Sequence, residues 1–353
     1  MPESQDSREF ESPPLRHFQQ SARQKEKTHL KSPLMKIKGV FNSGAPELIP
    51  GRIVSALKHG GKVVEGRSAI SQIVCQKLSE AVRRKLIMVV YIDGLPGSGK
   101  SGVTQRIADK VAKEGIIAPE LIFKLPLDPF LGTERASQER EKLTQSGPEF
   151  FHRHYLRYGE AAAVLDKIVD RITNGDSENI VLPKAYLRDG ENRGKFGEYT
   201  LRAEKGTRLI LVEGAGSIHN IATPRASSDE SQTYSVLMHA TNEESLFRAT
   251  LRDMLDGRSG MTFEQVYMRR QAEYQHLIPR LMHSIRESDV ICERFPKKND
   301  FAKSLVRREE ELAAEPENGY GPKRSIRRII AAVDPTFLKA VFPGSIPEKL
   351  ISG

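Results

Sequence analysis

Residues 94–101 are the feature that most constrains the fold of this chain. Their sequence, Gly-Leu-Pro-Gly-Ser-Gly-Lys-Ser, matches the pattern G-x-x-x-x-G-K-[ST] at every required position. An apolar run over 86–92 lies before it and is typical of a buried parallel strand, and a helical pattern begins at Ser101. The sequence therefore predicts a strand, a glycine-rich loop and a helix in direct succession, an arrangement that cradles phosphate groups.

The residue types of this loop explain why it would hold a nucleotide. Glycines let backbone N–H groups converge on phosphate oxygens, and the helix start adds unpaired N–H donors. Lys100 is long enough to reach the β- and γ-phosphates, and the hydroxyl of Ser101 is a ligand for Mg²⁺. The predicted nucleotide-binding residues are Gly94, Leu95, Pro96, Gly97, Ser98, Gly99, Lys100, Ser101 and Gly102. The alternative is a glycine-rich turn that fits the pattern by chance.

Composition limits the class of protein. The chain has 353 residues, 38% of them hydrophobic, which suits one enlarged domain or two. The apolar runs are too short to cross a bilayer, and the first residues lack the apolar core of a secretory signal. Cys75 and Cys292 give neither a disulfide framework nor a zinc-ligand spacing. We therefore expect a soluble, cytoplasmic protein in a reducing compartment.

The formal net charge of +9 favours anionic partners. Phosphate-facing Arg and Lys account for part of this charge, and a solvated basic tail accounts for most of the rest. Nucleic-acid binding through the basic termini is an alternative of low rank, because no aromatic–basic motif accompanies the charge. Whether the chain forms a homo-oligomer stays open.

The chain divides into three predicted segments. Residues 1–66 are of low complexity and are expected to form a disordered basic extension, 67–296 form the P-loop domain, and 297–353 form a charged, partly helical extension. Strands are predicted over 86–92, 121–126, 180–183, 198–201, 208–212, 234–238 and 289–292, the last at an edge of the sheet. Helices are predicted over 68–84, from Ser101 to about Gly115, over 148–172, over 245–284 with an interruption near 257–260, and within 329–342.

This alternation of strands and helices predicts an α/β fold of the P-loop NTPase type, an open and mostly parallel sheet with helices on both faces. The segments 180–183 and 198–201 are expected to pair as a β-hairpin insertion. Ligands of such sheets bind outside the carboxyl ends of the strands. Asp128 and Glu213 both follow predicted strands, as does the loop 94–101, so all three are expected at one site.

The order of two acidic motifs resembles a known family. Asp128-Pro129-Phe130 follows the second strand, and Glu213-Gly214 follows the strand over 208–212. Between about residues 85 and 293 the chain resembles the uridine kinase and phosphoribulokinase family of P-loop kinases. The resemblance implies that the Asp128 carboxylate takes the proton of the acceptor hydroxyl, and that Glu213 joins Ser101 near Mg²⁺. The alternatives are an ordinary turn at Asp128 and a loop or helix-capping acid at Glu213.

A third motif is similar to the arginine-bearing lid of that family. Arg248 and Arg252 lie four residues apart, on one helical face, and Asp253 follows. Arg258 comes next, with Ser259 inserted before the glycine that the family pattern requires. The resemblance implies that these three arginines neutralise charge on the transferred phosphoryl group, with Arg248 on the nucleotide. A solvated basic helix face is the alternative.

Two further residues are candidates for the acceptor pocket. Tyr186 lies in Leu-Pro-Lys-Ala-Tyr, which resembles the family's Pro-x-Tyr with one extra residue, although a packed tyrosine fits equally well. Arg157 falls near the position of the acid that grips ribose hydroxyls in the nucleoside kinases. A cation there cannot accept hydrogen bonds from ribose and suits a phosphate or carboxylate instead. Glu160 takes that position if the alignment shifts by a few residues.

The resemblance thus implies an ATP- and Mg²⁺-dependent kinase that acts on a hydroxyl of a small molecule and has no membrane partner. Uridine or cytidine is the first candidate acceptor. A phosphorylated sugar or a pantothenate-like acid is the second, because of Arg157. The rival interpretation is a nucleotide-binding regulator without transfer activity, which Leu131 and the inserted Ser259 leave open.

Overall fold

The computed structural model describes residues 63–134, 137–187, 192, 194–222, 231–256, 260–295, 297, 299–314, 325–342, 344 and 346–351. The chain divides into a unit over 1–48 and a unit over 49–353. All described residues belong to the second unit, which the following paragraphs concern. No helix among them is both long and apolar enough to span a membrane.

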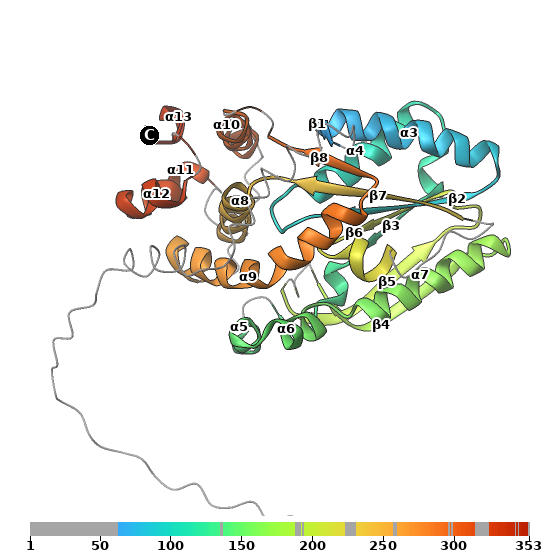
Figure 1. Ribbon diagram of the computed structural model, residues 1–353, viewed down its shortest axis with the longest axis horizontal. Coiled ribbons are helices and arrows are strands. Elements are labelled where there is room, and N and C mark those ends of the chain that lie inside the picture. Colours follow the sequence, from blue (N-terminus) through green and yellow to red (C-terminus); the bar gives the residue numbers. More distant parts are fainter. Residues whose placement is uncertain are drawn as a thin grey trace, which may run out of the picture. The chain divides into compact units, whose positions relative to one another are not determined.

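A six-stranded parallel sheet forms the centre of this unit (Figure 1). Its strands, in spatial order, are β1 (Val63–Glu65), β8 (Val290–Glu293), β7 (Ser231–His239), β2 (Ile87–Asp93), β6 (Leu209–Glu213) and β3 (Ile122–Pro126). All seven residues of β2 are buried, as its continuous apolar sequence predicts for a central parallel strand. The predicted α/β class and the predominantly parallel sheet are confirmed.

The prediction that the last strand lies at an edge of the sheet is wrong. β8 is flanked by β7 on one side and by β1 on the other, with Val63 paired to Ile291 and Glu65 paired to Glu293. A strand of three residues carries too little alternation to be recognised from its sequence.

Helices cover both faces of the sheet, with α3 and α4 on one face and α7 and α9 on the other (Figure 1). The helices are α3 (Arg67–Arg83), α4 (Lys100–Lys113), α5 (Gln138–Gln145), α6 (Pro148–Tyr155), α7 (Tyr158–Thr173), α8 (Asn242–Leu255), α9 (Phe263–Glu287), α10 (Asp300–Ala314), α11 (Ile326–Ala331), α12 (Pro335–Val341) and α13 (Glu348–Ile351). The apolar sides of α3 and α4 pack on β2, β6, β7 and β8 to form a continuous core.

The predicted helical region over 148–172 is interrupted at Leu156, which is extended, and at Arg157. Leu156 forms an isolated β-bridge with Leu131, and the backbone N–H of Arg157 donates to the carbonyl of Phe130 at 2.8 Å. These contacts end α6 at Tyr155 and fasten the chain to the segment that follows β3. The break therefore brings Arg157 close to the loop that carries Asp128.

The predicted hairpin is present as β4 (Glu178–Tyr186) and β5 (Phe196–Ala203), an antiparallel pair outside the main sheet. Its register shifts between Leu182 and Ala185. Pro183 lies at this irregularity, and because proline has no N–H to donate to the ladder, it favours a bulge there.

Candidate active site

The predicted phosphate loop joins the end of β2 to the start of α4. Gly97 and Gly99 have φ angles of 83° and 99°, a region that favours glycine. A Cβ on Gly97 would lie 2.1 Å from the carbonyl oxygen of Ser245 on α8, so only glycine lets these segments approach so closely. The loop is therefore packed directly against α8, the helix that carries Arg248 and Arg252.

Lys100 is buried at the first turn of α4. Its ammonium donates hydrogen bonds to the carbonyl oxygens of Gly94, at 2.9 Å, and Leu95, at 3.0 Å. Burial lowers the pKa of this ammonium, and the negative charges of Glu213 and Asp93 act against that shift. The side chain is thus held within the loop, where it would meet the terminal phosphates of a nucleotide.

Ser101 and Glu213 meet at the carboxyl end of the sheet. The Ser101 hydroxyl donates a 2.7 Å hydrogen bond to Oε1 of Glu213, although the residues are 112 positions apart. A hydroxyl and a carboxylate side by side are the oxygen ligands that Mg²⁺ takes beside phosphates. The predicted metal ligands therefore lie together, and their chemistry fits a magnesium ion.

Asp128 begins a 3-10 turn, Asp128–Phe130, directly after β3. The neighbouring Leu127 donates its backbone N–H to the carbonyl of Glu213 at 2.8 Å, which ties the ends of β3 and β6 together. Asp128, Glu213, Lys100 and Ser101 all line one cavity of about 410 Å³. The structure thus brings together the two acids, the ammonium and the hydroxyl that the sequence proposed as one site.

Several arginines surround the same cavity. Arg248 and Arg252 on α8 line it, as the sequence predicts, while Arg258 lies outside the described residues. Four further arginines, which no sequence motif marked, also line it, namely Arg67, Arg270, Arg294 and Arg308. Arg294 follows the carboxyl end of β8, and its place directly after a predicted strand is the signal that would have identified it.

The guanidinium groups around the cavity lie close enough to lower one another's pKa. Burial, followed by the charges of Arg67 and Arg252, lowers the pKa of the Arg248 guanidinium to about 10. Burial, Arg248 and Arg67 likewise lower the pKa of Arg294, whose Nη1 donates to the carbonyl of Ser98 at 2.7 Å. Nη1 of Arg248 has no hydrogen-bond partner within the described part of the chain. Such a cluster suits an anion with several charged oxygens.

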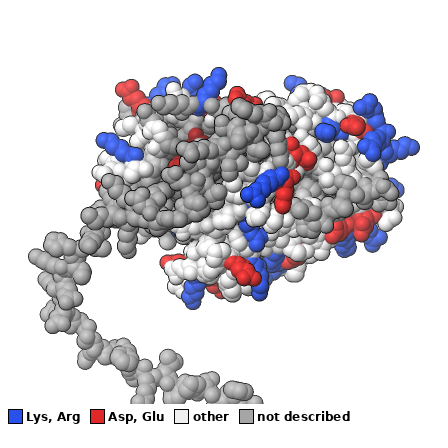
Figure 2. All heavy atoms as spheres, in the orientation of Figure 1, with Lys and Arg blue, Asp and Glu red and all other residues white. Residues whose placement is uncertain are grey.

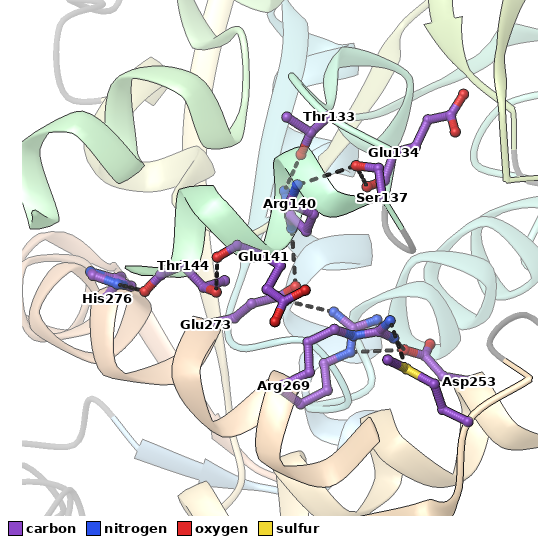
Figure 3. Close-up of polar contacts among 12 residues, drawn as sticks. Thr133, Glu134, Ser137, Arg140, Glu141, Thr144, Asp253, Arg269, Glu273 and His276 are labelled. Carbon is purple, nitrogen blue, oxygen red and sulfur yellow. Dashed lines mark hydrogen bonds and ion pairs between the residues drawn. The ribbon is translucent and has the colours of Figure 1, made fainter. Parts of the chain in front are cut away.

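A buried ionic network holds α8, the helix that bears Arg248 and Arg252, in place. Arg270 on α9 bonds Asp253 of α8, with Nε at 2.8 Å from Oδ2, and bonds Glu273 at 2.7 Å. Glu273 also accepts a 3.0 Å hydrogen bond from Arg140 of α5, and Arg269 lies 3.6 Å from Asp253 (Figure 3). The network locks α5, α8 and α9 together, so it positions Arg252 beside the loop.

The C-terminal helices line another part of the cavity, where Ser304 and Arg308 of α10 accompany apolar side chains. Leucine and isoleucine side chains of α8, α10 and α11 line it, namely Leu251, Leu255, Leu305, Leu312 and Ile326. The residues of α10 and α11 lie outside the segment that resembles the kinase family, so no motif predicted a role for them. The side chains of Leu305, Leu312 and Ile326 form an apolar wall of the same cavity as the predicted phosphate loop.

Two predicted residues do not line this cavity. Tyr186 is buried and packs edge-on against Phe196, with ring centroids 6.5 Å apart. Arg157 bonds Glu160 at 2.5 Å and also donates to the carbonyls of Pro129 and Lys184. The side chains of both residues are therefore engaged by neighbouring protein groups. Their roles as acceptor ligands stay predictions.

The surface gives no simple charged face in the view of Figure 2. Basic and acidic side chains stand side by side among the residues drawn in colour. The interspersed pattern is typical of a solvated protein surface.

Comparison with known proteins gives matches among solved structures alone. No family model matches the chain, and no curated protein matches it. A possible uridine kinase from Bacillus stearothermophilus is similar at 16% identity and a TM-score of 0.39, over 63% of this chain and 97% of that one. The YGR205w protein is similar at 15% identity and a TM-score of 0.40, over 61% and 89%.

A third similar structure is YFH7 from Saccharomyces cerevisiae, described provisionally as a P-loop kinase with a circular permutation. It is 11% identical, with a TM-score of 0.41, over 65% of this chain and 99% of that one. Because these scores and identities are low, the fold assignment rests on the sheet order and the loop described above. A possible uridine kinase is thus among the solved structures to which this chain is similar.

Proposed function

We propose that this protein transfers the γ-phosphoryl group of ATP to a hydroxyl group of a small molecule. The observation that supports this function is the single cavity lined by Lys100, Ser101, Asp128 and Glu213. A phosphate-binding ammonium, a pair of oxygen ligands for a metal and a further carboxylate are the groups that phosphoryl transfer requires.

Asp128 is the proposed general base. It follows β3 and lines the cavity. A carboxylate at this position would orient an acceptor hydroxyl toward the phosphate and accept its proton. A bond forms between the acceptor oxygen and the γ-phosphorus while the bond from that phosphorus to the bridging oxygen of ADP breaks. The proton of the hydroxyl passes to Asp128, and ADP leaves.

The remaining charged groups act by position. Ser101 and Glu213 would hold a magnesium ion, which neutralises charge on the phosphate oxygens when it is bound. Arg248 and Arg252, together with Arg258 of the predicted lid, would balance the charge that spreads over the transferred group. The rate enhancement then comes mainly from orientation and electrostatic stabilisation.

The apolar wall is the proposed site of the nucleotide base. The side chains of Leu305, Leu312 and Ile326 border the same cavity as the loop. A flat heteroaromatic ring gains free energy by displacing water from such a surface. We therefore infer that the C-terminal helices contribute to nucleotide binding.

Uridine or cytidine is the proposed acceptor. The second candidate, a phosphorylated or carboxylated acceptor, depends on a cation at Arg157 that is available to bind it. The guanidinium of Arg157 is already engaged by Glu160 and by two backbone carbonyls. This observation favours the nucleoside over the anionic acceptor.

Release of ADP from MgATP tests the proposal, with uridine, cytidine, a sugar phosphate and pantothenate as separate acceptors. We expect uridine or cytidine to raise ADP release above the ATPase background. Asp128→Asn should bind ATP with unchanged affinity and lose about a thousandfold in rate. If ATP binds but no acceptor raises ADP release, transfer is excluded for these acceptors and the regulator interpretation is favoured.

A further inference from the structure

Two histidines and a glutamate gather on the surface where α9 meets the π-helical turn Ile218–Ala222. Nδ1 of His219, in the turn, lies 3.2 Å from each carboxylate oxygen of Glu287. His283 lies four residues before Glu287, on the same side of α9. One ligand atom from each of the three side chains falls within 4.8 Å of the others.

These separations approach those of a metal centre. In a tetrahedral zinc site with bonds of about 2.1 Å, neighbouring ligand atoms lie about 3.4 Å apart. The distance between His219 and Glu287 is already close to that value. The imidazoles of His219 and His283 are stacked, with centroids 4.8 Å apart, so a rotation of one ring brings its nitrogen to the ion. Because His283 is exposed, this rotation meets little resistance.

The chemistry of the ligands selects the class of ion. Two imidazole nitrogens and one carboxylate oxygen suit zinc and similar transition metals, whereas magnesium and calcium take oxygen ligands. The magnesium pair at Ser101 and Glu213 is composed of oxygen ligands only. The two sites therefore differ in the metal that they would select.

The cluster is connected to the phosphate loop through Asp93. The backbone N–H of Ile218, next to His219, donates to Oδ2 of Asp93 at 3.2 Å. The hydroxyl of Ser284, next to His283, donates to the same oxygen at 2.7 Å. The turn and α9 thus both bond to Asp93, the last residue of β2 before the phosphate loop.

We propose that His219, His283 and Glu287 bind one zinc ion, with water in the fourth position, and that this ion fastens the π-helical turn to α9. The turn follows the segment after Glu213, so the ion stabilises the position of that segment. The proposal does not depend on the transfer activity, because it concerns binding and stability alone.

Zinc titration of the full chain by calorimetry, in excess Mg²⁺, tests this site. We expect His283→Ala and Glu287→Gln each to weaken binding of one zinc equivalent at least tenfold, and zinc to raise the melting temperature of the unaltered protein more than that of either variant. Cobalt should give visible absorption bands of a tetrahedral site that His283→Ala removes. His154→Ala, at an exposed histidine stacked on Phe150, is the matched control.

Unchanged zinc affinity and stoichiometry in both His283→Ala and Glu287→Gln would overturn the proposal. So would an increase in melting temperature that is equal in the variants and in the unaltered protein. Circular dichroism without metal verifies that each variant is folded, so that a loss of zinc binding reflects the ligands. Histidines of residues 1–62 affect all variants equally, and therefore do not produce the difference.

Discussion

The hydroxyl of Ser284, in the long helix α9, donates a 2.7 Å hydrogen bond to the carboxylate of Asp93 at the end of the central strand β2. The same carboxylate accepts backbone N–H groups of Gly94 at 2.6 Å, Gly216 at 2.7 Å and Ile218 at 3.2 Å. One buried acid therefore joins the phosphate loop, the segment after Glu213 and α9. No motif marked Asp93 in the sequence, although it precedes the loop directly.

Asp93→Asn is expected to destabilise the fold by about 3 kcal/mol, because an amide group cannot accept four hydrogen bonds and leaves buried donors unsatisfied. Ser284→Ala removes one donor and should cost about 1 kcal/mol. Urea denaturation measures both values. Equal effects of the two substitutions would contradict the view that Asp93 joins three segments.

The buried network between α5, α8 and α9 gives a second prediction. Burial acts to raise the pKa of the Glu273 carboxyl, but the charges of Arg140 and Arg270 outweigh it and hold the pKa well below its usual range. Glu273→Gln should therefore cost about 3 to 5 kcal/mol, since it leaves the buried guanidinium of Arg140 without its anion and leaves Arg270 with Asp253 alone. Glu149→Gln, in an exposed ion pair with Arg153, should cost less than about 1 kcal/mol and serves as the control.

His152 provides a pH dependence with a defined sign. Burial, then the charge of Arg280 and the neighbouring His276, lowers its pKa from 6.5 to about 4. The unfolded chain therefore binds a proton that the folded chain does not, and stability falls as the pH drops from 6.5 to 4. The group contributes about 3 kcal/mol to this loss, which follows from 1.36 kcal/mol for each pKa unit. His152→Leu should flatten the slope of stability between these pH values, and an unchanged slope would contradict the assignment.

The arginine cluster predicts that the folded protein is stabilised by a compact polyanion. Burial, and after it the mutual repulsion of the arginines, lowers the pKa of Arg248 and Arg294. Pyrophosphate should raise the melting temperature, because its negative charge offsets this repulsion in the folded protein. The increase should be at least halved in Arg248→Ala and in Arg294→Ala. Arg153→Ala, at an exposed arginine away from the cavity, should keep the full increase.

Local patterns predicted the elements that depend on adjacent residues. The loop 94–101 and the central strands follow from a motif and from apolar runs, so their places, and the meeting of Asp128 with Glu213, were predictable. The interactions that fix the site join residues far apart. Arg140 and Glu273 are 133 residues apart, and the break between α6 and α7 depends on a bridge to Leu131. No sequence period records such contacts, which explains why the network and the break were missed.

The proposed base site gives the last prediction, because it predicts that the apolar side chains of α10 and α11 contact the base and not the phosphates. Leu305→Ala removes part of the wall and should weaken ATP binding about tenfold, while pyrophosphate, which has no base, keeps its affinity. Leu350→Ala is the matched control, since Leu350 is equally buried in the C-terminal segment but does not line the cavity. Both substitutions should cost about 2 to 5 kcal/mol of stability, so calorimetry at low temperature compares folded proteins. Equal losses for ATP and pyrophosphate in Leu305→Ala would mean that the C-terminal helices do not contact the base.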